Sequence, residues 1–572
     1  MNKSKDLIFR IVQEAKSYDR LEDIEKLVEG QTSLAVIPVQ PLYVAITSAG
    51  SDQVAEVLPR MSKPQRQAML DLDLWKKDEV DYNSFDFWIE SYAKVKEPEI
   101  IEDFVSAEDF ALYLRSRVNV YTFDVEDPEY PDHDFYFLTD DSLLLIEYGE
   151  DYPNPNELKY LIRHLYDKMG VEKAYAHLFK IVNDSHLELE EAQYQAKKER
   201  LKDYGFVDYF DAMESLVDFP SYPAMDRFIN ERKAVTAEVS KLSQNQSLHH
   251  SAVTGFNEDQ DILMDELAKV EDEKRQAYLH FTFVRLVNSA ITLKDALKGG
   301  RIELNRVSKS TRMYLNLGLE YIRTKREGSL FDDFDFFDVF RVGRTLISLE
   351  QRKLKKNLRI HQFDTDENEG FLGTWWGSFV DQSLSEYPKV KNFGAALHAQ
   401  EVKNLSIYYF WKSLNKQLVD SLPFAGEFFK VFTKLKEDGH LHNDFYLNYD
   451  IEQIDFEAII LSSFVSFTLN QNLDESTMNK MGITISEFKQ FLEILFKRTQ
   501  EEYFLLNFED QKMQESIISF NTKYGLGKIE GFDKYIYGLL TEHLAGYNFD
   551  ELEDEEYKHI GGPIFLNTLV KN

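Results

Sequence analysis

The chain has 572 residues, of which 66 are Lys or Arg and 100 are Asp or Glu, so its formal net charge is −34. An apolar content of 43% is enough to build a large core, which excludes a globally disordered chain. The absence of cysteine excludes disulfide frameworks, Cys-ligated zinc and thiol nucleophiles. The acidic excess repels phosphates at long range, so we do not expect nucleic acid as a partner.

The location of the protein is predicted from two features that the sequence lacks, a membrane-spanning run and a secretory signal. No segment reaches the run of about 18 apolar residues that a membrane-spanning helix needs. Residues 1–27 carry charges throughout, unlike a secretory signal with its apolar middle region. We therefore expect no membrane span and a cytoplasmic protein, and the sequence carries no indication of its oligomeric state.

The first part of the chain, residues 1–117, has apolar residues at helical spacings of three and four. Pro41 and Pro64 stand where the first turn of a helix tolerates proline, which predicts a series of short helices. A weak match between the sequences around Met61 and Val105 indicates a degenerate helical repeat of the solenoid type. The alternative is a set of ordinary amphipathic helices of similar length.

Residues 118–152 have a different pattern. Runs rich in β-branched and aromatic residues are interrupted at Asp140-Asp141-Ser142, which predicts a β-hairpin or small sheet with a turn at this point. Residues 124–151 hold eleven acidic residues and no Lys or Arg. We expect an acidic β insertion in a helical protein.

Helical patterns return after the insertion and continue to the end of the chain. The polar stretch 243–257 loses all periodicity and is the best candidate for a linker. The fold class is therefore mainly α, a multi-helix and solenoid-like array with a small inserted β-hairpin. The predicted organisation is a short-helix array (1–117), the acidic insertion (118–152), a helical middle region (153–242), the linker (243–257) and a C-terminal helical region (258–572).

Four segments together resemble a bacterial family known as domain of unknown function 6178. They are residues 37–75, 204–214 (YGFVDYFDAME), 340–346 (FRVGRTL) and 561–566 (GGPIFL). The first is the most specific, with a proline-containing entry, a Gly-centred break and a Leu-Asp-Leu-Asp-x-Trp type exit. The resemblance implies a mostly helical, bacterial, cytoplasmic protein. It implies no activity and supplies no catalytic residues.

The segment Gly373-Thr374-Trp375-Trp376-Gly377 is the leading candidate for a partner-binding site. Adjacent side chains point about 100° apart on a helix, so Trp375 and Trp376 do not both fit one narrow core stripe. We expect at least one of them at an interface or a pocket rim. The alternative is that both pack between subdomains.

A basic cluster is the second candidate for a partner-binding surface in this acidic chain. On a helix its five side chains cover much of the surface and could contact an acidic partner, RNA or lipid headgroups. The alternative is a solvated helix end that the helix dipole favours. The cluster consists of Arg352, Lys353, Lys355, Lys356 and Arg359.

Two further patterns suggest small-ligand sites. Arg341 and Arg344 flank Val342-Gly343 and could bind an anion, or could pair with the carboxylates of residues 331–338 at helical spacing. His440 and His442, with Asp444, are weak candidates for a zinc site, because alternate side chains of an extended segment face one way. The alternative for the histidines is a polar turn between two helices.

Searches for catalytic motifs fail, since the chain has no phosphate-binding loop, no dinucleotide fingerprint, no H-E-x-x-H and no nucleophile elbow. We therefore expect no cofactor and no resident metal. The favoured function is that of a non-enzymatic helical interaction or scaffold protein that binds another protein. The alternative is an enzyme of the metal-dependent hydrolase type, with a site assembled from distant residues.

Overall fold

The computed structural model is mainly helical, which confirms the predicted fold class. Strands occur in small antiparallel sheets of two or three members within the described part of the chain. No helix in that part is both long and apolar enough to cross a membrane. The structure describes residues 33–35, 37, 39–183, 186–202, 204, 206–233, 262–365, 368, 370–391, 399–439, 453–469, 483–499, 503–544, 548–550, 552–553, 556–558 and 564–566.

The chain divides into two compact units. Unit 1 comprises Met1–Asp218, Asp226–Leu315 and Ile322–Arg341. Unit 2 comprises Phe219–Met225, Asn316–Tyr321 and Val342–Asn572. The predicted linker, residues 243–257, lies outside the described residues.

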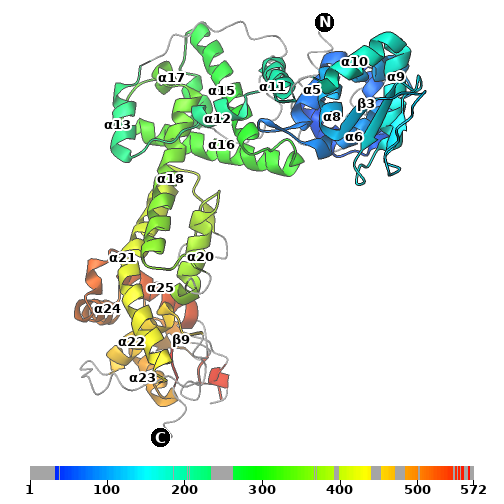
Figure 1. Cartoon of the computed structure of the whole chain (residues 1–572). Helices are drawn as coiled ribbons and strands as arrows, with labels where there is room; N and C mark the ends of the chain where they lie inside the picture. Colours follow the sequence, from blue (N-terminus) through cyan, green and yellow to red (C-terminus); the bar gives the residue numbers. More distant parts are fainter. Residues whose placement is uncertain are drawn as a thin grey trace. The chain divides into compact units, whose positions relative to one another are not determined.

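Unit 1 is built mostly from helices, which are short in its first part and of mixed length afterwards (Figure 1). The first series consists of α3 (Val39–Thr47), α4 (Ser51–Val57), the 3₁₀ turn η2 (Leu58–Arg60), α5 (Lys63–Asp73), α6 (Tyr82–Ala93), α7 (Pro98–Val105) and α8 (Glu108–Arg117). The second series consists of α9 (Pro155–Met169), α10 (Val171–Asn183), α11 (His186–Lys202), α12 (Tyr209–Ser215), α14 (Ile262–Leu267), α15 (Glu273–Leu293) and α17 (Leu330–Asp333). Residues of both units occur in α13 (Tyr222–Glu231), α16 (Gly300–Arg323) and α18 (Phe336–Ile360). The predicted sequence repeat stays a prediction.

The start of α5 illustrates why these short segments become helices. Ser62 and Gln65 form a capping box, in which each side chain binds the backbone amide of the other residue, and Pro64 occupies the first turn. The side-chain nitrogen of Gln65 also donates to the carbonyl oxygens of Leu34 and Ile37, at 3.0 and 2.9 Å. The cap therefore fixes the helix and ties the preceding chain to it.

Buried polar groups in unit 1 are held by specific partners. The carboxylate of Asp73 accepts a hydrogen bond from Tyr43 Oη and another from Trp88 Nε1, both at 2.8 Å. Tyr43 and Trp88 are fully buried. Because a buried carboxylate without donors is costly, these two bonds let Asp73 stay in the core at the end of α5.

The predicted β insertion is confirmed as a three-stranded antiparallel sheet in the order β3 (Val118–Thr122), β5 (Leu144–Tyr148), β4 (Tyr136–Leu138). The predicted turn joins β4 to β5, with Ser142 in the left-handed region at φ +57°. The carboxylate of Asp141 accepts the backbone amide of Leu143 at 3.1 Å, the local bond that favours Asp in turns. Helices α8 and α10 contact β3 (Figure 1).

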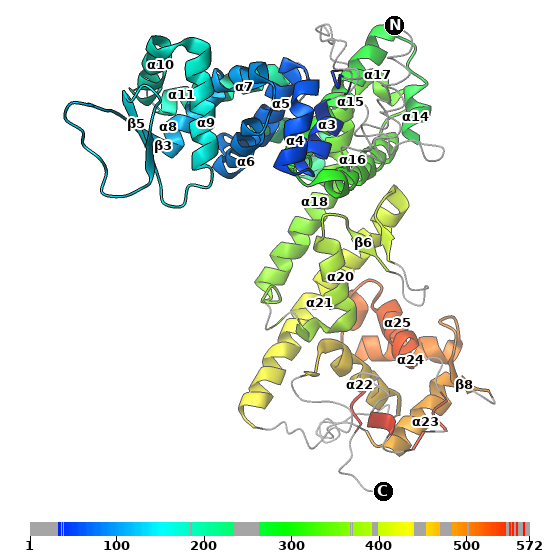
Figure 2. The ribbon, with the colours of Figure 1, turned by 90° about the vertical axis from the view of Figure 1, so that its right-hand side faces the viewer.

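Unit 2 surrounds the helix α22 (Phe456–Leu469), which contacts α20, α21, α23, α24 and α25 (Figure 2). This helix is apolar on nearly all sides, as expected for one buried on all sides. The helices around it are α20 (Gly373–Leu384), α21 (Leu405–Glu437), α23 (Ile485–Leu495), α24 (Gln511–Lys523) and α25 (Phe532–Leu544). The short elements are β6 (Lys389–Val390) with β7 (Gln400–Glu401), β8 (Phe496–Arg498) with β9 (Tyr503–Leu505), and the 3₁₀ turns η4 (Gly370–Leu372), η7 (Leu526–Lys528) and η8 (Glu556–Lys558).

Candidate ligand-binding pocket

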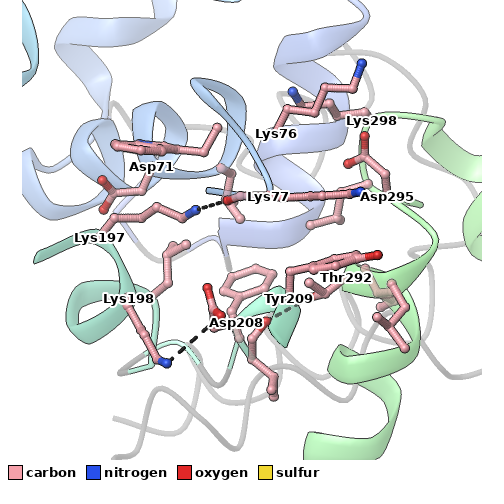
Figure 3. Close-up of a pocket in the computed structure, with 18 residues that line it drawn as sticks. Asp71, Lys76, Lys77, Lys197, Lys198, Asp208, Tyr209, Thr292, Asp295 and Lys298 are labelled. Carbon is pink, nitrogen blue, oxygen red and sulfur yellow. Dashed lines mark hydrogen bonds and ion pairs between the residues drawn. The ribbon is translucent and has the colours of Figure 1, made fainter. Parts of the chain in front are cut away.

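A pocket of about 260 Å³ lies within unit 1 (Figure 3). Its walls come from the end of α5 and the hairpin β1 (Trp75–Lys76) to β2 (Glu79–Val80), from α11, from residues 206–209, and from the end of α15 with the turn that follows. The lining residues are Asp71, Leu72, Trp75, Lys76, Lys77, Lys197, Lys198, Leu201, Phe206, Val207, Asp208, Tyr209, Ile291, Thr292, Leu293, Asp295, Leu297 and Lys298. In Figure 3, Lys197 and Lys198 lie on the side opposite Thr292 and Asp295.

Two backbone features place polar groups at this pocket. Lys77 occupies the two-residue turn of the β1–β2 hairpin with φ +64°, which few residues other than Gly, Asn and Asp adopt. Asp295 follows the end of α15 with φ +49°. Thr292 Oγ1 donates to the carbonyl oxygen of Val207 at 3.1 Å, which joins α15 to the 206–209 stretch.

The pocket reverses the charge balance of the chain, because five of its lining residues are lysines and three are aspartates. Two of the aspartates are already engaged. Arg200 donates to both oxygens of Asp71, at 2.8 and 2.6 Å. Asp208 accepts Tyr194 Oη at 2.6 Å, caps the start of α12 and lies 4.0 Å from the Nζ of Lys198. Even with Lys198 paired, four lysines remain against Asp71 and Asp295, a local cationic excess in a chain whose net charge is −34.

Lys197 is the most buried of the five lysines, with 9% of its surface exposed. Its Nζ donates to the carbonyl oxygen of Lys77 at 3.2 Å and lies 4.9 Å and 4.8 Å from the ring centres of Trp75 and Tyr194. Burial lowers the pKa of Lys197 to about 8, although Asp208, Asp71 and Asp78 act against the shift. Aromatic faces thus take the place of a carboxylate partner.

The other pocket lysines have different surroundings. Lys298 Nζ donates to the carbonyl oxygen of Asp73 at 3.0 Å and lies 3.8 Å from the carboxylate of Asp81. Lys77 is exposed, and its Nζ lies 5.1 Å from the ring centre of Tyr209. Among the described residues, neither Lys76 nor Lys77 has a carboxylate within ion-pair distance. These two ammonium groups are available to an anion that enters the pocket.

The Trp pair predicted to bind a partner lies on α20, where Trp376 is 1% and Trp375 8% exposed. The backbone amides of Trp375 and Trp376 donate to Glu457 Oε1 at 2.7 and 3.4 Å. A second pocket of about 100 Å³ borders Trp375, and Lys391 Nζ lies 5.9 Å from its ring centre. Partner binding by the pair stays a prediction, with little tryptophan surface to support it.

Glu457 is almost completely buried in α22 beneath the start of α20. Burial raises its pKa to about 8, helped by the charge of Asp455 and opposed by the two amide hydrogen bonds. Gly373 has φ +87°, and a Cβ at this position would collide with the Glu457 side chain. His543 Nε2 lies 4.0 Å from Glu457, and burial lowers the pKa of His543.

The predicted basic cluster lies on α18, where all five side chains are exposed while Leu354 and Leu358 are buried. Arg352 donates to Ser348 Oγ at 3.2 Å. Lys353, Lys355, Lys356 and Arg359 have no carboxylate within ion-pair distance among the described residues. Their role in binding a partner stays a prediction.

The remaining predicted site residues are the two arginines and the His-His-Asp set. Arg341 belongs to unit 1, where its Nε donates to the carbonyl oxygen of Val217 at 2.8 Å, whereas Arg344 belongs to unit 2. Anion binding by this pair stays a prediction. His440, His442 and Asp444 lie outside the described residues. Within the described residues no group of three or more His, Asp or Glu side chains could hold a metal ion.

The pocket itself was missed by sequence reasoning, because its lysines come from segments far apart in the chain. One signal was present. Lys76-Lys77 and Lys197-Lys198 are adjacent pairs of like charge in a strongly acidic sequence. The first pair follows Trp75, an arrangement that could have suggested an apolar wall beside cations.

Comparison with known proteins places the chain in a family. The model of a family of unknown function, DUF6178, matches residues 3–395. The chain belongs to this family. The part matched to DUF6178 includes every residue that lines the 260 Å³ pocket, the Trp pair and the basic cluster, but not Glu457. Neither a curated protein nor a solved structure matches the chain.

Proposed function

We propose that this protein binds a small organic anion in the lysine-lined pocket of unit 1. The observation that carries the proposal is the cationic excess of the pocket in a chain with 100 acidic residues. Bulk composition disfavours lysine clusters in such a chain, so their convergence on one concave site calls for a negative ligand.

The walls of the pocket restrict the ligand further. Apart from its charged groups and Thr292, the pocket is lined by aliphatic and aromatic side chains, including Trp75, Phe206, Ile291 and Leu297. A volume of about 260 Å³ lies just below the usual range for ligand sites, roughly 300 to 1,000 Å³, which favours a small ligand. The expected ligand has one carboxylate or phosphate group and a short apolar body.

Calorimetry with two probes tests the proposal. 4-Methylpentanoate and phenyl phosphate supply the two anionic groups on apolar bodies of suitable size, and we expect saturable binding of at least one of them that weakens as NaCl is raised. The double substitution Lys77→Gln and Lys298→Gln should weaken this binding by about tenfold, the equivalent of about 1.4 kcal/mol. Lys353→Gln on α18 is the matched control, which removes one lysine far from the pocket in sequence. Absence of binding by both probes would overturn the proposal.

A second candidate function is the predicted binding of another protein. The observation that favours it is the row of exposed cations on α18, four of which have no carboxylate within ion-pair distance among the described residues. The complementary partner is an acidic segment of another protein. Replacing Lys353, Lys355, Lys356 and Arg359 by Glu should abolish co-purification of such a partner, and an unchanged set of retained proteins contradicts this candidate. If the unsubstituted protein retains RNA instead of a protein, and the Glu variant does not, the α18 surface binds nucleic acid.

A further inference from the structure

Lys197 differs from the other pocket lysines in what surrounds its amine. Among the described residues, Nζ has one hydrogen-bond acceptor, the carbonyl oxygen of Lys77, and no carboxylate within ion-pair distance. Trp75 and Tyr194 flank the amine with their ring faces. The Lys197 amine can therefore make further hydrogen bonds, or a covalent bond, to a small molecule in the pocket.

Resting on the proposed anion-binding function, we propose that Lys197 Nζ forms an imine with the carbonyl carbon of a 2-oxo carboxylate bound in the pocket. The ligand class follows from the lining. The carboxylate is placed next to the reacting carbon and suits the cations Lys77 and Lys298, whereas Lys198 is paired with Asp211 at 3.1 Å. The apolar walls suit an aliphatic chain on the other side of the carbonyl group.

The protonation state of Lys197 is compatible with this chemistry. With a pKa of about 8, roughly a tenth of the amine is neutral at pH 7, against far less than a hundredth for an ordinary lysine. A neutral amine has one lone pair and two hydrogens, so it can keep its hydrogen bond to the Lys77 carbonyl while the lone pair attacks. Desolvation of an amine among apolar side chains is a known way to make lysine nucleophilic.

The step balances without an oxidant, a reductant or a metal. The Nζ lone pair forms the C–N bond as the carbonyl π electrons move to oxygen, and a proton passes from nitrogen to that oxygen to give a carbinolamine. The nitrogen lone pair then forms the C=N double bond while the hydroxyl group, after accepting a proton, leaves as water, and the nitrogen proton is released. Hydrolysis reverses the sequence, so the product is a reversible covalent complex.

Reductive trapping tests the inference on the full chain. The protein is incubated with 4-methyl-2-oxopentanoate and sodium cyanoborohydride, which reduces an imine to a stable secondary amine, and is then analysed by intact mass and peptide mapping. We expect one adduct per chain, located on Lys197. Lys197→Arg should remove the adduct because it keeps a cation beside Trp75 but lacks the nucleophilic amine. Lys202→Arg, a control on the same helix but outside the pocket lining, should be trapped like the original chain.

The outcomes separate the inference from the proposed function on which it rests. Adducts spread over many exposed lysines, or no adduct on a protein that binds 4-methylpentanoate in calorimetry, would overturn the imine while leaving anion binding intact. Absence of binding by both calorimetry probes, without an adduct, would overturn both. Peptide mapping of the unsubstituted protein identifies the modified lysine even if Lys197→Arg does not fold.

Discussion

Lys197 in unit 1 and Glu457 in unit 2 are both buried ionisable groups with strongly shifted pKa values, yet their surroundings differ. Glu457 is 1% exposed, and one of its oxygens accepts two backbone amides at the start of α20. Lys197 is 9% exposed, has one backbone acceptor and borders a pocket of about 260 Å³. The pocket next to Trp375, by contrast, measures about 100 Å³.

This comparison separates two uses of a perturbed pKa. The Glu457 carboxyl group holds α22 to the start of α20 through its hydrogen bonds, so removing it should unfold part of unit 2. For the Lys197 amine we expect a contribution to stability so small that a neutral side chain of similar length could replace it. A shifted pKa indicates function only where unused bonding capacity and space for a ligand accompany it. Four measurements test this contrast.

The largest expected effect is that of Glu457→Ala. The substitution leaves the backbone amides of Trp375 and Trp376 without their acceptor and opens a cavity, so we expect the free energy of unfolding of unit 2 to fall by about 3 to 5 kcal/mol. Urea unfolding measures it, with hydrogen exchange at α20 as a local readout. Glu457→Gln keeps an oxygen acceptor and should lose only about 1 kcal/mol. Equal losses for the two variants would contradict the anchoring role.

Gly373→Ala tests the same contact between α20 and Glu457 by changing the α20 residue. It places a side chain at φ +87° and pushes Cβ into Glu457, so we expect a loss of about 2 to 3 kcal/mol in urea unfolding. Gly377 lies on the same helix with no neighbouring atom within 4 Å of the place that a Cβ would take, and Gly377→Ala should raise stability by up to about 1 kcal/mol. An unchanged free energy of unfolding in Gly373→Ala would mean that α20 does not depend on the close contact between Gly373 and Glu457.

The pH dependence of unit 2 provides the third test. Because the folded-state pKa of Glu457 is raised to about 8, the folded state binds more protons than the unfolded state between about pH 4.5 and 8, so stability is greatest below this window and falls as pH rises through it. Asp455, whose pKa burial raises to about 6, adds to the fall at the acidic end. We expect a slope of about 1 kcal/mol per pH unit near neutrality. Glu457→Gln should flatten it, and an unchanged slope would contradict the assignment.

The smallest effect on stability is expected for Lys197→Met. Methionine fills a similar volume between Trp75 and Tyr194 and buries no charge, so the free energy of unfolding should change by about 1 kcal/mol or less. Trapping of 4-methyl-2-oxopentanoate should nevertheless be lost completely. A large loss of stability would place Lys197 in the same class as Glu457, as a structural group.

Much of the fold followed from local patterns. Helical spacing, Pro64 at the start of α5 and the β-branched runs on either side of the Asp140–Ser142 turn each act over a few residues, so they can be recognised in a single sequence. The surroundings of the Trp pair depend on a contact of longer range. The angular argument identified two unusual side chains, but Glu457, which binds their backbone amides, lies 81 and 82 residues further along the chain.

The pocket depends on contacts of longer range still. Lys197 meets the hairpin turn at Lys77 across 120 residues, and no periodicity or motif links the two positions. Its nearest aromatic neighbour in sequence, Tyr194, is an ordinary helical residue until tertiary packing places Trp75 opposite it. Sites of this kind form only when tertiary structure brings distant residues together. Their main sequence signal is a local charge opposite to the net charge of the chain.

The strand order of the larger sheet has a consequence for self-association. The middle strand, β5, is paired on both sides, so only β3 and β4 present an outer edge. β4 is three residues long and β3 five. Short edge strands offer little backbone for another chain to pair with. The acidic residues of 124–134 add like-charge repulsion between copies. A β insertion in a helical protein is thereby kept from acting as a seed for aggregation.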